Sequence, residues 1–385
     1  MRWVPLTIAL LVSLGLGAAQ KTEDVCPAAN RALALGRLEE ARGRYEDCLK
    51  QGPIRFDTLS NLGTVYAQLS KYDLAIQAYQ QALALDPENA PVRMNLGLAY
   101  LKAGHPADAA KEFERSLLDG AENPKTEELL ALCHYQTKEY SLAALEASRA
   151  HDALPEESSA AFLLGSSYLK MGLYKQAIPH LYFAAQKTDT AETHMFLGEA
   201  FLGVKAYKEA LREFLRSSAL APQTPGLHSD LGTAYAGLSR VKDALAEYQK
   251  ELARDPSDFE ATYYLGRLKR LSGEVEDSKR LLAKAEQMRP GDPAVEYEYA
   301  VFAMNDKDYP KAEQLLTGIL EKLPDYADAH VLLAEVYFKM RRREDGNRQK
   351  AIVEALKQAD QERTTAEGKA REKQAGGGSR SAPHP

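Results

Sequence analysis

Residues 56–89 read FDTLSNLGTVYAQLSKYDLAIQAYQQALALDPEN, and this order of residue types returns along most of the chain. Its fixed points are a Leu-Gly pair, two aromatic residues, an alanine and a proline: Leu62, Gly63, Tyr66, Tyr79, Ala75 and Pro87. The next copy begins at residue 90, and the Leu-Gly pair stands again at 96–97, 164–165, 197–198 and 231–232. Self-similarity with a period of about 20 to 50 residues indicates small structural units stacked in a row. The fold is therefore decided by one short unit and its repetition.

This pattern resembles the tetratricopeptide repeat, in which each unit of about 34 residues folds into two antiparallel helices. Nine copies follow one another from residue 22 to residue 326, and a tenth begins near residue 327. The resemblance implies an all-α, right-handed superhelical solenoid of about ten helix-turn-helix hairpins over residues 20–340. The predicted repeats are 22–55, 56–89, 90–123, 124–157, 158–190, 191–224, 225–258, 259–292, 293–326 and a partial repeat at 327–340.

The residue types of the repeat have a physical explanation. Small residues such as Gly63 and Ala75 are expected where two helix backbones approach closely, and Tyr66 and Tyr79 are expected to fill the wider space between neighbouring pairs. Pro87 is unsuited to a helix interior and marks the start of the next repeat. Because one repeat cannot bury its apolar face alone, stacked neighbours share an elongated core. The 20 tyrosines of the chain are mainly a packing feature of the repeat.

The first 19 residues have the features of a secretory signal peptide. Arg2 supplies a positive charge, residues 3–16 are uncharged and mainly apolar, and small residues at 17 and 19 suit cleavage after Ala19. We therefore expect a bacterial-type exported protein that is periplasmic or secreted. The alternative is an anchor that is not cleaved, since residues 3–20 are 18 uncharged residues, barely enough to span a bilayer. In that case this segment would be the chain's contact with a membrane.

The opposite end of the chain is strongly charged. Residues 341–373 contain ten Lys/Arg and seven Asp/Glu, with one apolar stripe at helical spacing that includes Ile352 and Leu356. A solenoid needs an end unit with a polar outer face, so we expect 341–373 to form a charged capping helix. Residues 374–385, rich in glycine and serine, are expected to be a disordered tail. Residues 341–385 carry a net charge of +4, which an anionic surface could attract, although a solvated cap explains it equally simply.

The composition argues against several classes of function. A formal net charge of −6 is too small to suggest binding to nucleic acid, and three cysteines and eight histidines are few for a disulfide scaffold or a metal array. His194, His228 and His330 occupy the same position in different repeats, so they cannot converge on one metal ion. The sequence has no phosphate-binding loop, nucleophile elbow or Cys-x-x-Cys pair. We expect a protein that is not an enzyme and that takes no cofactor, metal or small-molecule substrate.

Two cysteines stand near the start of the predicted solenoid. Cys26 lies at the beginning of the first predicted helix, where Pro27 suits the first helical position, and Cys48 lies near the end of the antiparallel partner helix. These two ends of a hairpin are neighbours, so an exported chain could join them in a disulfide that closes a loop of about 20 residues. Cys133 is expected to be a buried free thiol.

Proteins with this repeat usually bind their ligands in a concave groove lined by the first helices, at positions two, five, nine and twelve of each repeat. Carried over residue by residue, the resemblance implies thirteen groove residues: Met94, Leu98, Leu101, Phe162, Leu169, Met195, Glu199, Leu202, Tyr263, Arg267, Arg270, Tyr297 and Met304. Large apolar side chains and methionines facing a groove could receive an extended peptide or an amphipathic helix. The alternative is that several of them pack against other parts of the same chain.

One specialised form of the family holds the carboxylate ends of chaperones with five polar or basic residues. Asn30 and Asn61 match its two asparagines, but Cys26 replaces the first basic residue, and Pro91 and Asn95 replace the lysine and arginine of the third repeat. Because three of the five positions differ, the sequence does not predict a co-chaperone of this type.

These features together predict a scaffold that binds another polypeptide, a protein or a peptide, along its concave groove. One alternative is a structural subunit of a cell-envelope or secretion assembly, held by its convex face or its basic end. Another is an arm that recruits substrates for an enzyme on a separate chain.

Overall fold

The computed structural model of the protein describes residues 26–119 and 123–377, so the predicted signal peptide and residues 378–385 of the predicted tail lie outside it. All regular structure in the described residues is α-helix, in twenty helices. The prediction of an all-α repeat fold is therefore confirmed. No helix in these two ranges is both long and apolar enough to cross a bilayer.

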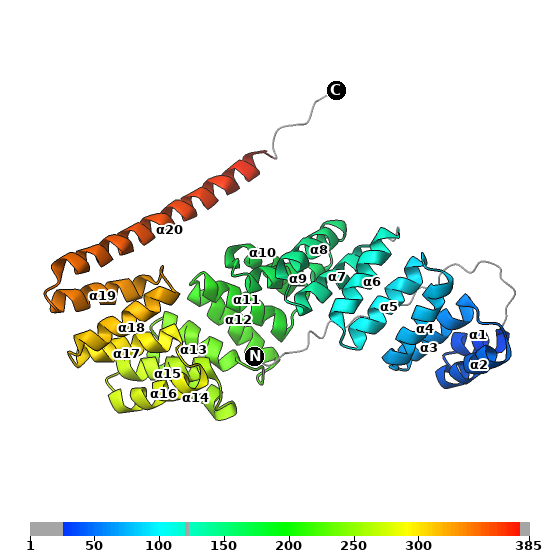
Figure 1. Cartoon of the computed structure of the whole chain (residues 1–385), viewed down its shortest axis with the longest axis horizontal. Coiled ribbons are helices and arrows are strands. Elements are labelled where there is room, and N and C mark those ends of the chain that lie inside the picture. Colours follow the sequence, from blue (N-terminus) through cyan, green and yellow to red (C-terminus); the bar gives the residue numbers. More distant parts are fainter. Residues whose placement is uncertain (1–25, 120–122, 378–385) are drawn as a thin grey trace, which may run out of the picture. The chain divides into compact units, whose positions relative to one another are not determined.

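The chain divides into two compact units, and the first ends at Leu238. Figure 1 shows its helices in blue to green. They are α1 (Pro27–Ala34), α2 (Leu38–Gln51), α3 (Phe56–Gln68), α4 (Tyr72–Leu85), α5 (Ala90–Lys102), α6 (Pro106–Leu118), α7 (Pro124–Gln136), α8 (Tyr140–Ala153), α9 (Ser158–Lys170), α10 (Tyr174–Lys187), α11 (Ala191–Gly203), α12 (Tyr207–Leu220) and α13 (Leu227–Gly237).

The second unit begins at Ser239. Its helices are α14 (Val241–Arg254), α15 (Phe259–Leu271), α16 (Val275–Met288), α17 (Pro293–Asn305), α18 (Tyr309–Lys322), α19 (Ala327–Lys339) and α20 (Arg343–Gly377). Odd-numbered helices coincide with the first helices of the predicted repeats, and even-numbered helices with the second.

Within each unit, a helix packs against the helices before and after it in the chain. In the first unit α3 packs on α4 and α4 on α5, and in the second unit α15 packs on α16 and α18 on α19. Second helices such as α4 and α18 are therefore covered on two sides, by their own first helix and by the first helix of the next repeat. This arrangement produces the shared core that the repeat pattern predicts.

The turn between the two helices of a repeat has a constant conformation. The fifteenth residue of all ten repeats has a positive φ, and four of the ten are glycines: Gly36, Ser70, Gly104, Lys138, Gly172, Lys205, Ser239, Gly273, Lys307 and Arg341. A left-handed residue after a helix closes its last turn by binding the carbonyls left free there. The recurrence at residue 341 extends the same geometry to the tenth repeat, whose second helix is α20.

The recurring glycine makes room for the aromatic residue of its own repeat. The ring of Tyr79 covers Gly63, and a Cβ on this glycine would lie 2.6 Å from the Tyr79 Cε1 atom. Gly97 and Phe113 form the same contact. Glycine is required here because the aromatic ring takes the volume that a side chain would need. Tyr79 also belongs to a buried cluster with Leu96 and Ala99 of the next repeat, in agreement with the expected role of this tyrosine between neighbouring pairs.

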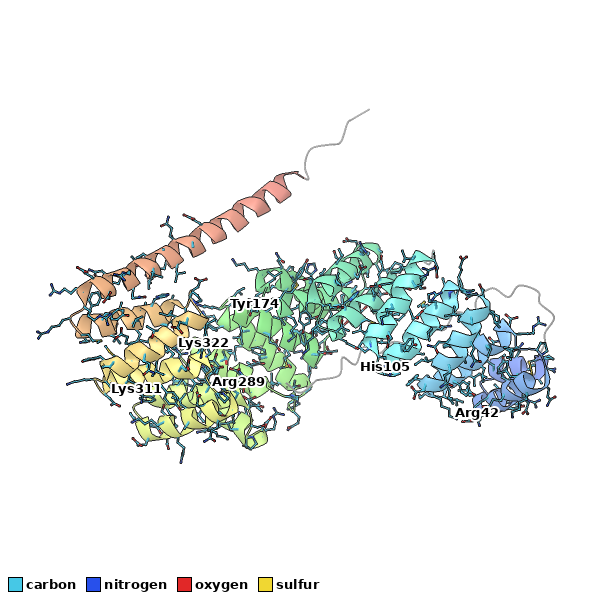
Figure 2. All side chains as sticks on the ribbon, in the orientation of Figure 1. Arg42, His105, Tyr174, Arg289, Lys311 and Lys322 are labelled. Atoms are coloured by element: carbon cyan, nitrogen blue, oxygen red, sulfur yellow. A yellow bond between two sulfur atoms is a disulfide. The ribbon has the colours of Figure 1, made fainter. Side chains whose placement is uncertain are left out.

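A second glycine contact joins neighbouring repeats. The ring of Tyr174, which Figure 2 labels at the start of α10, lies against Gly203 at the end of α11, so closely that a Cβ there would overlap the ring. Tyr207 lies in the same way against Gly237 of the following repeat. These tyrosines fill the space between repeats, which was the role expected for the recurring tyrosines of the pattern.

The last helix, α20, packs against α19, the first helix of the tenth repeat. Val353 of α20 is buried, and the ring of Phe338 of α19 lies against Gly346. The helix continues to Gly377, past the predicted boundary at residue 373.

Candidate functional site

The thirteen predicted groove residues lie on five first helices, and they fall into two separate groups. Helices α5, α9 and α11 carry the eight in the first unit, and α15 and α17 carry the five in the second unit. Three of the thirteen, Phe162, Leu169 and Tyr263, are buried in the chain's own core, and Arg267 is exposed. The other nine are half-buried, which leaves each with some surface for contact.

The three predicted groove residues of α5 mainly support the core. Met94, Leu98 and Leu101 pack against a buried cluster that includes Phe113 and Leu129. All three are half-buried, so only part of each side chain remains exposed.

A second surface of the first unit lies where α9 contacts both α7 and α11. Here the ring centroids of Phe162 and Phe196 are 5.2 Å apart, and Phe196 also packs against the cluster that contains Tyr135. We call this the α7–α11 surface: Glu192, Phe196 and Glu199 are its half-buried members, and Tyr135 and Phe162 are the buried rings near Phe196.

Three members of the α7–α11 surface were missed by the sequence reasoning. Tyr135 and Glu192 stand at positions twelve and two of their repeats, which are groove positions, so the repeat frame could have identified them. Phe196 stands at position six, which the frame does not assign to the groove. The ring of Phe196 belongs to the α7–α11 surface through its contact with Phe162.

The carboxylates of the α7–α11 surface are partly removed from water. Burial raises the pKa of Glu192 and that of Glu199, and Lys170 offsets part of the rise at Glu199. The Lys170 Nζ atom lies 3.9 Å from Glu199 Oε2 and 5.3 Å from the centroid of the Phe196 ring. Burial together with nearby negative charge also raises the pKa of Tyr135. Such a surface favours a positive charge, because a cation would compensate the desolvated carboxylates and face the aromatic ring.

The second unit has a surface of a different kind on α15 and α17. The fully buried carboxylate of Glu298 receives Arg270 Nε at 2.5 Å and faces Arg267 Nε at 3.4 Å. The rings of Tyr297 and Tyr326 are 5.8 Å apart beside this group, and burial raises the pKa of Tyr326 to about 12. Arg270 is held inside the chain, whereas Arg267 leaves 46% of its side chain exposed.

His194 and His330, two of the three histidines at position four, each link the two helices of their own repeat. His194 Nδ1 lies 2.7 Å from Glu213 Oε2, and His330 Nδ1 lies 2.6 Å from Gln349 Oε1. In the third repeat, Arg93 Nη1 lies 3.1 Å from Glu112 Oε2 at the equivalent positions. The position is therefore used for a polar contact between helices. Among the described residues, no group of three or more potential metal ligands is found.

The N-terminal hairpin contains a disulfide between Cys26 and Cys48, with the two Cα atoms 6.4 Å apart. Cys26 precedes α1 directly, and Pro27 occupies the first turn of this helix. Cys133 is a buried free cysteine, and burial raises the pKa of its thiol to about 12. Asn61 Nδ2 donates to Asn30 Oδ1 at 3.4 Å, so the two asparagines of the resemblance do lie side by side.

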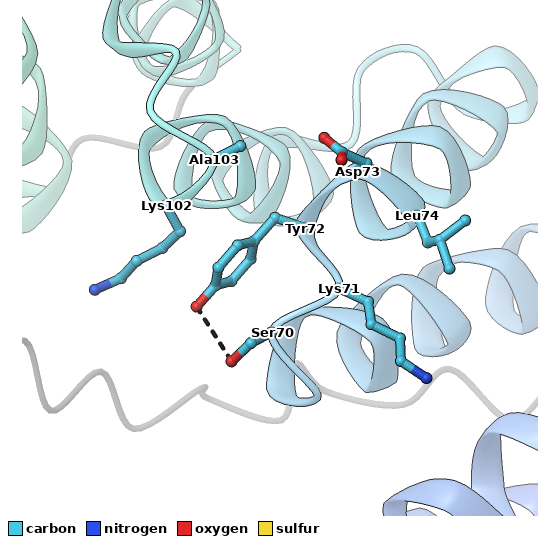
Figure 3. A pocket seen from close by; sticks show the side chains of 7 residues that line it. All are labelled: Ser70, Lys71, Tyr72, Asp73, Leu74, Lys102 and Ala103. Carbon is cyan, nitrogen blue, oxygen red and sulfur yellow. Dashed lines mark hydrogen bonds between the residues drawn. The ribbon is translucent and has the colours of Figure 1, made fainter.

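A shallow pocket of about 470 Å³ lies at the turn between α3 and α4 and the end of α5 (Figure 3). Its lining consists of Ser70, Lys71, Tyr72, Asp73, Leu74, Lys102 and Ala103. The Tyr72 hydroxyl donates to Ser70 Oγ at 3.4 Å within it. None of the thirteen predicted groove residues lines this pocket.

Comparisons with known proteins agree with the helical repeat. Models described as "TPR repeat" and "Tetratricopeptide repeat" match residues 63–104, 162–226, 229–293 and 303–364. A model described as anaphase-promoting complex, cyclosome, subunit 3 matches residues 107–184.

Curated relatives match parts of the chain. The chain is 32% identical to the Hsp70-Hsp90 organizing protein of Triticum aestivum over 102 residues, which is 26% of this chain and 17% of the wheat protein. It is 25% identical to BBSome complex member BBS4 of Bos taurus over 188 residues, 47% of this chain and 36% of the bovine protein. It is 35% identical to the photosystem I assembly protein Ycf3 of Synechococcus sp. (strain WH7803) over 88 residues, 22% of this chain and 50% of that protein. The chain thus spans half or less of the length of these relatives.

Solved structures of similar chains include yeast Tom70, with a TM-score of 0.40, 14% identity, and coverage of 88% of this chain and 96% of that chain. A repeat protein from Parabacteroides merdae has a TM-score of 0.45 and 15% identity, covering 68% of this chain and 97% of its own. YrrB, described as a TPR protein with an unusual peptide-binding site, has a TM-score of 0.43 and 16% identity. The match covers 55% of this chain and 98% of YrrB. The matching sequence models, together with the regular helix pairing, show that this chain contains tetratricopeptide repeats.

Proposed function

We propose that this protein is a non-enzymatic scaffold that binds another polypeptide along its first helices. The observation that carries the proposal is the α7–α11 surface, where aromatic side chains and partly desolvated carboxylates from three successive repeats lie together. Surfaces of this composition gain free energy by covering apolar area and by pairing their charges. The similarity to the Hsp70-Hsp90 organizing protein and BBS4, whose names describe work with other proteins, supports a binding role.

Affinity capture with matched variants tests this proposal. Phe196→Glu places a charge on the first-helix surface of the first unit, and Tyr297→Glu does the same in the second unit, because both side chains are half-buried. Leu215→Glu is the control, since Leu215 lies on the second helix α12 and is 48% exposed. The partner is first captured by the wild-type chain and identified by mass spectrometry. We expect its capture to be lost in one first-helix variant and kept in the control. Capture that survives both first-helix variants contradicts it.

A structural subunit held by its second helices is a second candidate. The large apolar side chains exposed on α8, α10 and α12 include Leu142, Leu145, Tyr182 and Leu215, each 45–48% exposed. Exposed apolar residues that gather on one side of a protein often mark an interface. The same capture experiment separates the two candidates, because this one expects Leu215→Glu to lose the partner and Phe196→Glu to keep it.

We also propose that the protein is exported, on the basis of the apolar segment and small residues before position 20. Fractionation of the native cells, followed by N-terminal sequencing of the mature chain, tests this. A chain that begins at Gln20 in the exported fraction supports the proposal, and a full-length chain in the cytoplasmic fraction contradicts it.

A further inference from the structure

We propose that the α7–α11 surface binds an extended segment of the partner polypeptide that carries a lysine or arginine beside apolar residues. In this arrangement Glu192 and Glu199 receive the cationic group, and the half-buried Phe196 contacts its alkyl chain and the neighbouring apolar side chains. The inference rests on the proposed function and specifies the chemistry of the ligand at this site.

The first support is the order of side chains along α11. Glu192, Phe196 and Glu199 are separated by four and then three residues. Side chains at these spacings lie on one face of a helix, so the aromatic ring stands between the two carboxylates. The buried ring of Phe162 on the neighbouring helix α9 packs against Phe196, and the two ring centroids are 5.2 Å apart.

The second support is the state of the two carboxylates. Within the described residues, Glu192 has no hydrogen bond or ion pair, although burial raises its pKa. Glu199 has one basic neighbour, Lys170, at a distance too long for a hydrogen bond. Partly buried carboxylates without strong partners are costly, and a cation from outside would remove this cost.

The third support is Lys170 itself, which shows that an ammonium group fits here. Its Nζ atom lies 5.3 Å from the centre of the Phe196 ring and near Glu199 Oε2, a geometry that combines a cation–π contact with charge attraction. The Lys170 side chain remains 38% exposed, so a cation from a partner can join it or displace it. Two carboxylates and one ammonium leave the surface one negative charge in excess, which a single basic residue would balance.

Selection from a random peptide library displayed on phage tests the inference with the full chain as bait. Peptides of roughly twelve residues are long enough to reach about 40 Å when extended, which exceeds the width of several helices. The wild-type chain should enrich peptides with a lysine or arginine next to an apolar or aromatic residue. The double variant Glu192→Gln/Glu199→Gln, which keeps the side-chain volumes, should bind the enriched peptides about tenfold or more weakly. The exposed Glu209 of α12 provides the control, and Glu209→Gln should leave their affinity unchanged.

The outcomes distinguish this inference from the proposed function. Some enriched peptides could bind Phe196→Glu more weakly and yet lack basic residues, or bind the double glutamine variant normally. Such peptides would overturn the inference and leave the proposed binding function standing. If the selection yields no peptide that depends on Phe196 or Tyr297, both proposals are overturned. Replacement of the lysine in an enriched peptide by norleucine should also weaken binding and reduce its sensitivity to salt, because the charge is removed while the alkyl chain is kept.

Discussion

At the scale of single residues, the contact between a glycine of the first helix and a ring of the second is the most demanding feature of the repeat. In Gly97→Ala, the new Cβ would lie 2.6 Å from Phe113 Cε1, and Phe113 is fully buried. We expect the variant to lower the free energy of unfolding of the first unit by about 1–3 kcal/mol, the usual cost of overpacking. Urea denaturation monitored by circular dichroism measures this.

Gly43→Ala is the matched comparison, and its effect should have the opposite sign. Gly43 lies inside α2, and a Cβ built there meets no atom within 4 Å. Alanine in a helix interior is more stable than glycine by about 0.5–1 kcal/mol. Equal destabilisation by both substitutions would show that the ring contact is not the cause of the first effect.

The cysteines provide a second prediction at the residue scale. The chain has three cysteines, and the disulfide joins two of them. A denatured, unreduced sample should therefore contain one reactive thiol per chain, and a reduced sample three. In the folded protein at pH 8, Cys133 should react slowly with a thiol reagent, because burial raises its pKa to about 12. Three thiols without reduction would contradict the disulfide.

The sequence predicted some of these residue contacts and could not predict others. The repeat frame identified Gly63 and Tyr79 as important, but the ring that covers Gly63 comes from the same repeat, and only the helix packing reveals this. Phe162 and Tyr263 stand at groove positions, yet they are buried because neighbouring helices close over them. Burial depends on the size of side chains on other helices, and the position number within a repeat does not contain that information.

At the scale of helices, the ion pair between Asp189, just before α11, and Arg216 of α12 should make the stability of the first unit depend on pH. The Arg216 guanidinium, with help from His194, lowers the pKa of Asp189 to about 2. A carboxylate with a lowered pKa contributes stability above its unfolded value near 4, and this contribution is lost as the pH falls towards 2. Wild-type protein should therefore lose more stability between pH 4 and pH 2 than Asp189→Asn does. Identical slopes of the urea midpoint against pH would contradict this.

The last helix provides another prediction at this scale. Val353 of α20 is buried in the second unit, whereas Ala355, two residues on, is exposed. Val353→Asp should lower the stability of this unit by about 2–4 kcal/mol, because it buries a charge and removes apolar contacts. Ala355→Asp should have little effect. Thermal denaturation of the two variants measures the difference, and equal stability would mean that α20 does not cap the tenth repeat.

Helix positions were the most predictable feature of this chain. The regular return of the Leu-Gly pair located the first and second helices of each repeat, and the left-handed residue at position fifteen recurs even where it is Lys138 or Arg341 rather than glycine. Local signals specify these turns, because each hairpin depends on contacts close in sequence. The length of α20 was less predictable, since its far end has few apolar residues that could mark a boundary.

At the scale of the whole molecule, one repeated unit carries surfaces of different chemistry. The α7–α11 surface of the first unit combines aromatic rings with carboxylates, while the surface on α15 and α17 of the second unit combines tyrosines with Arg267. Because the core positions of the repeat hold the fold, the remaining positions are free to vary in charge. This separation of roles explains how one repeated unit of ordinary composition can carry two surfaces of different chemistry.

Site-specific photo-crosslinking in the native cells can show whether the first helices contact a partner polypeptide. Benzoylphenylalanine would replace Phe196 on α11, and in a separate variant it would replace Leu215 on α12, which is 48% exposed. We expect position 196 to yield a cross-linked polypeptide that mass spectrometry can identify, and we expect no cross-link from position 215. A cross-link from position 215 with none from position 196 would contradict it.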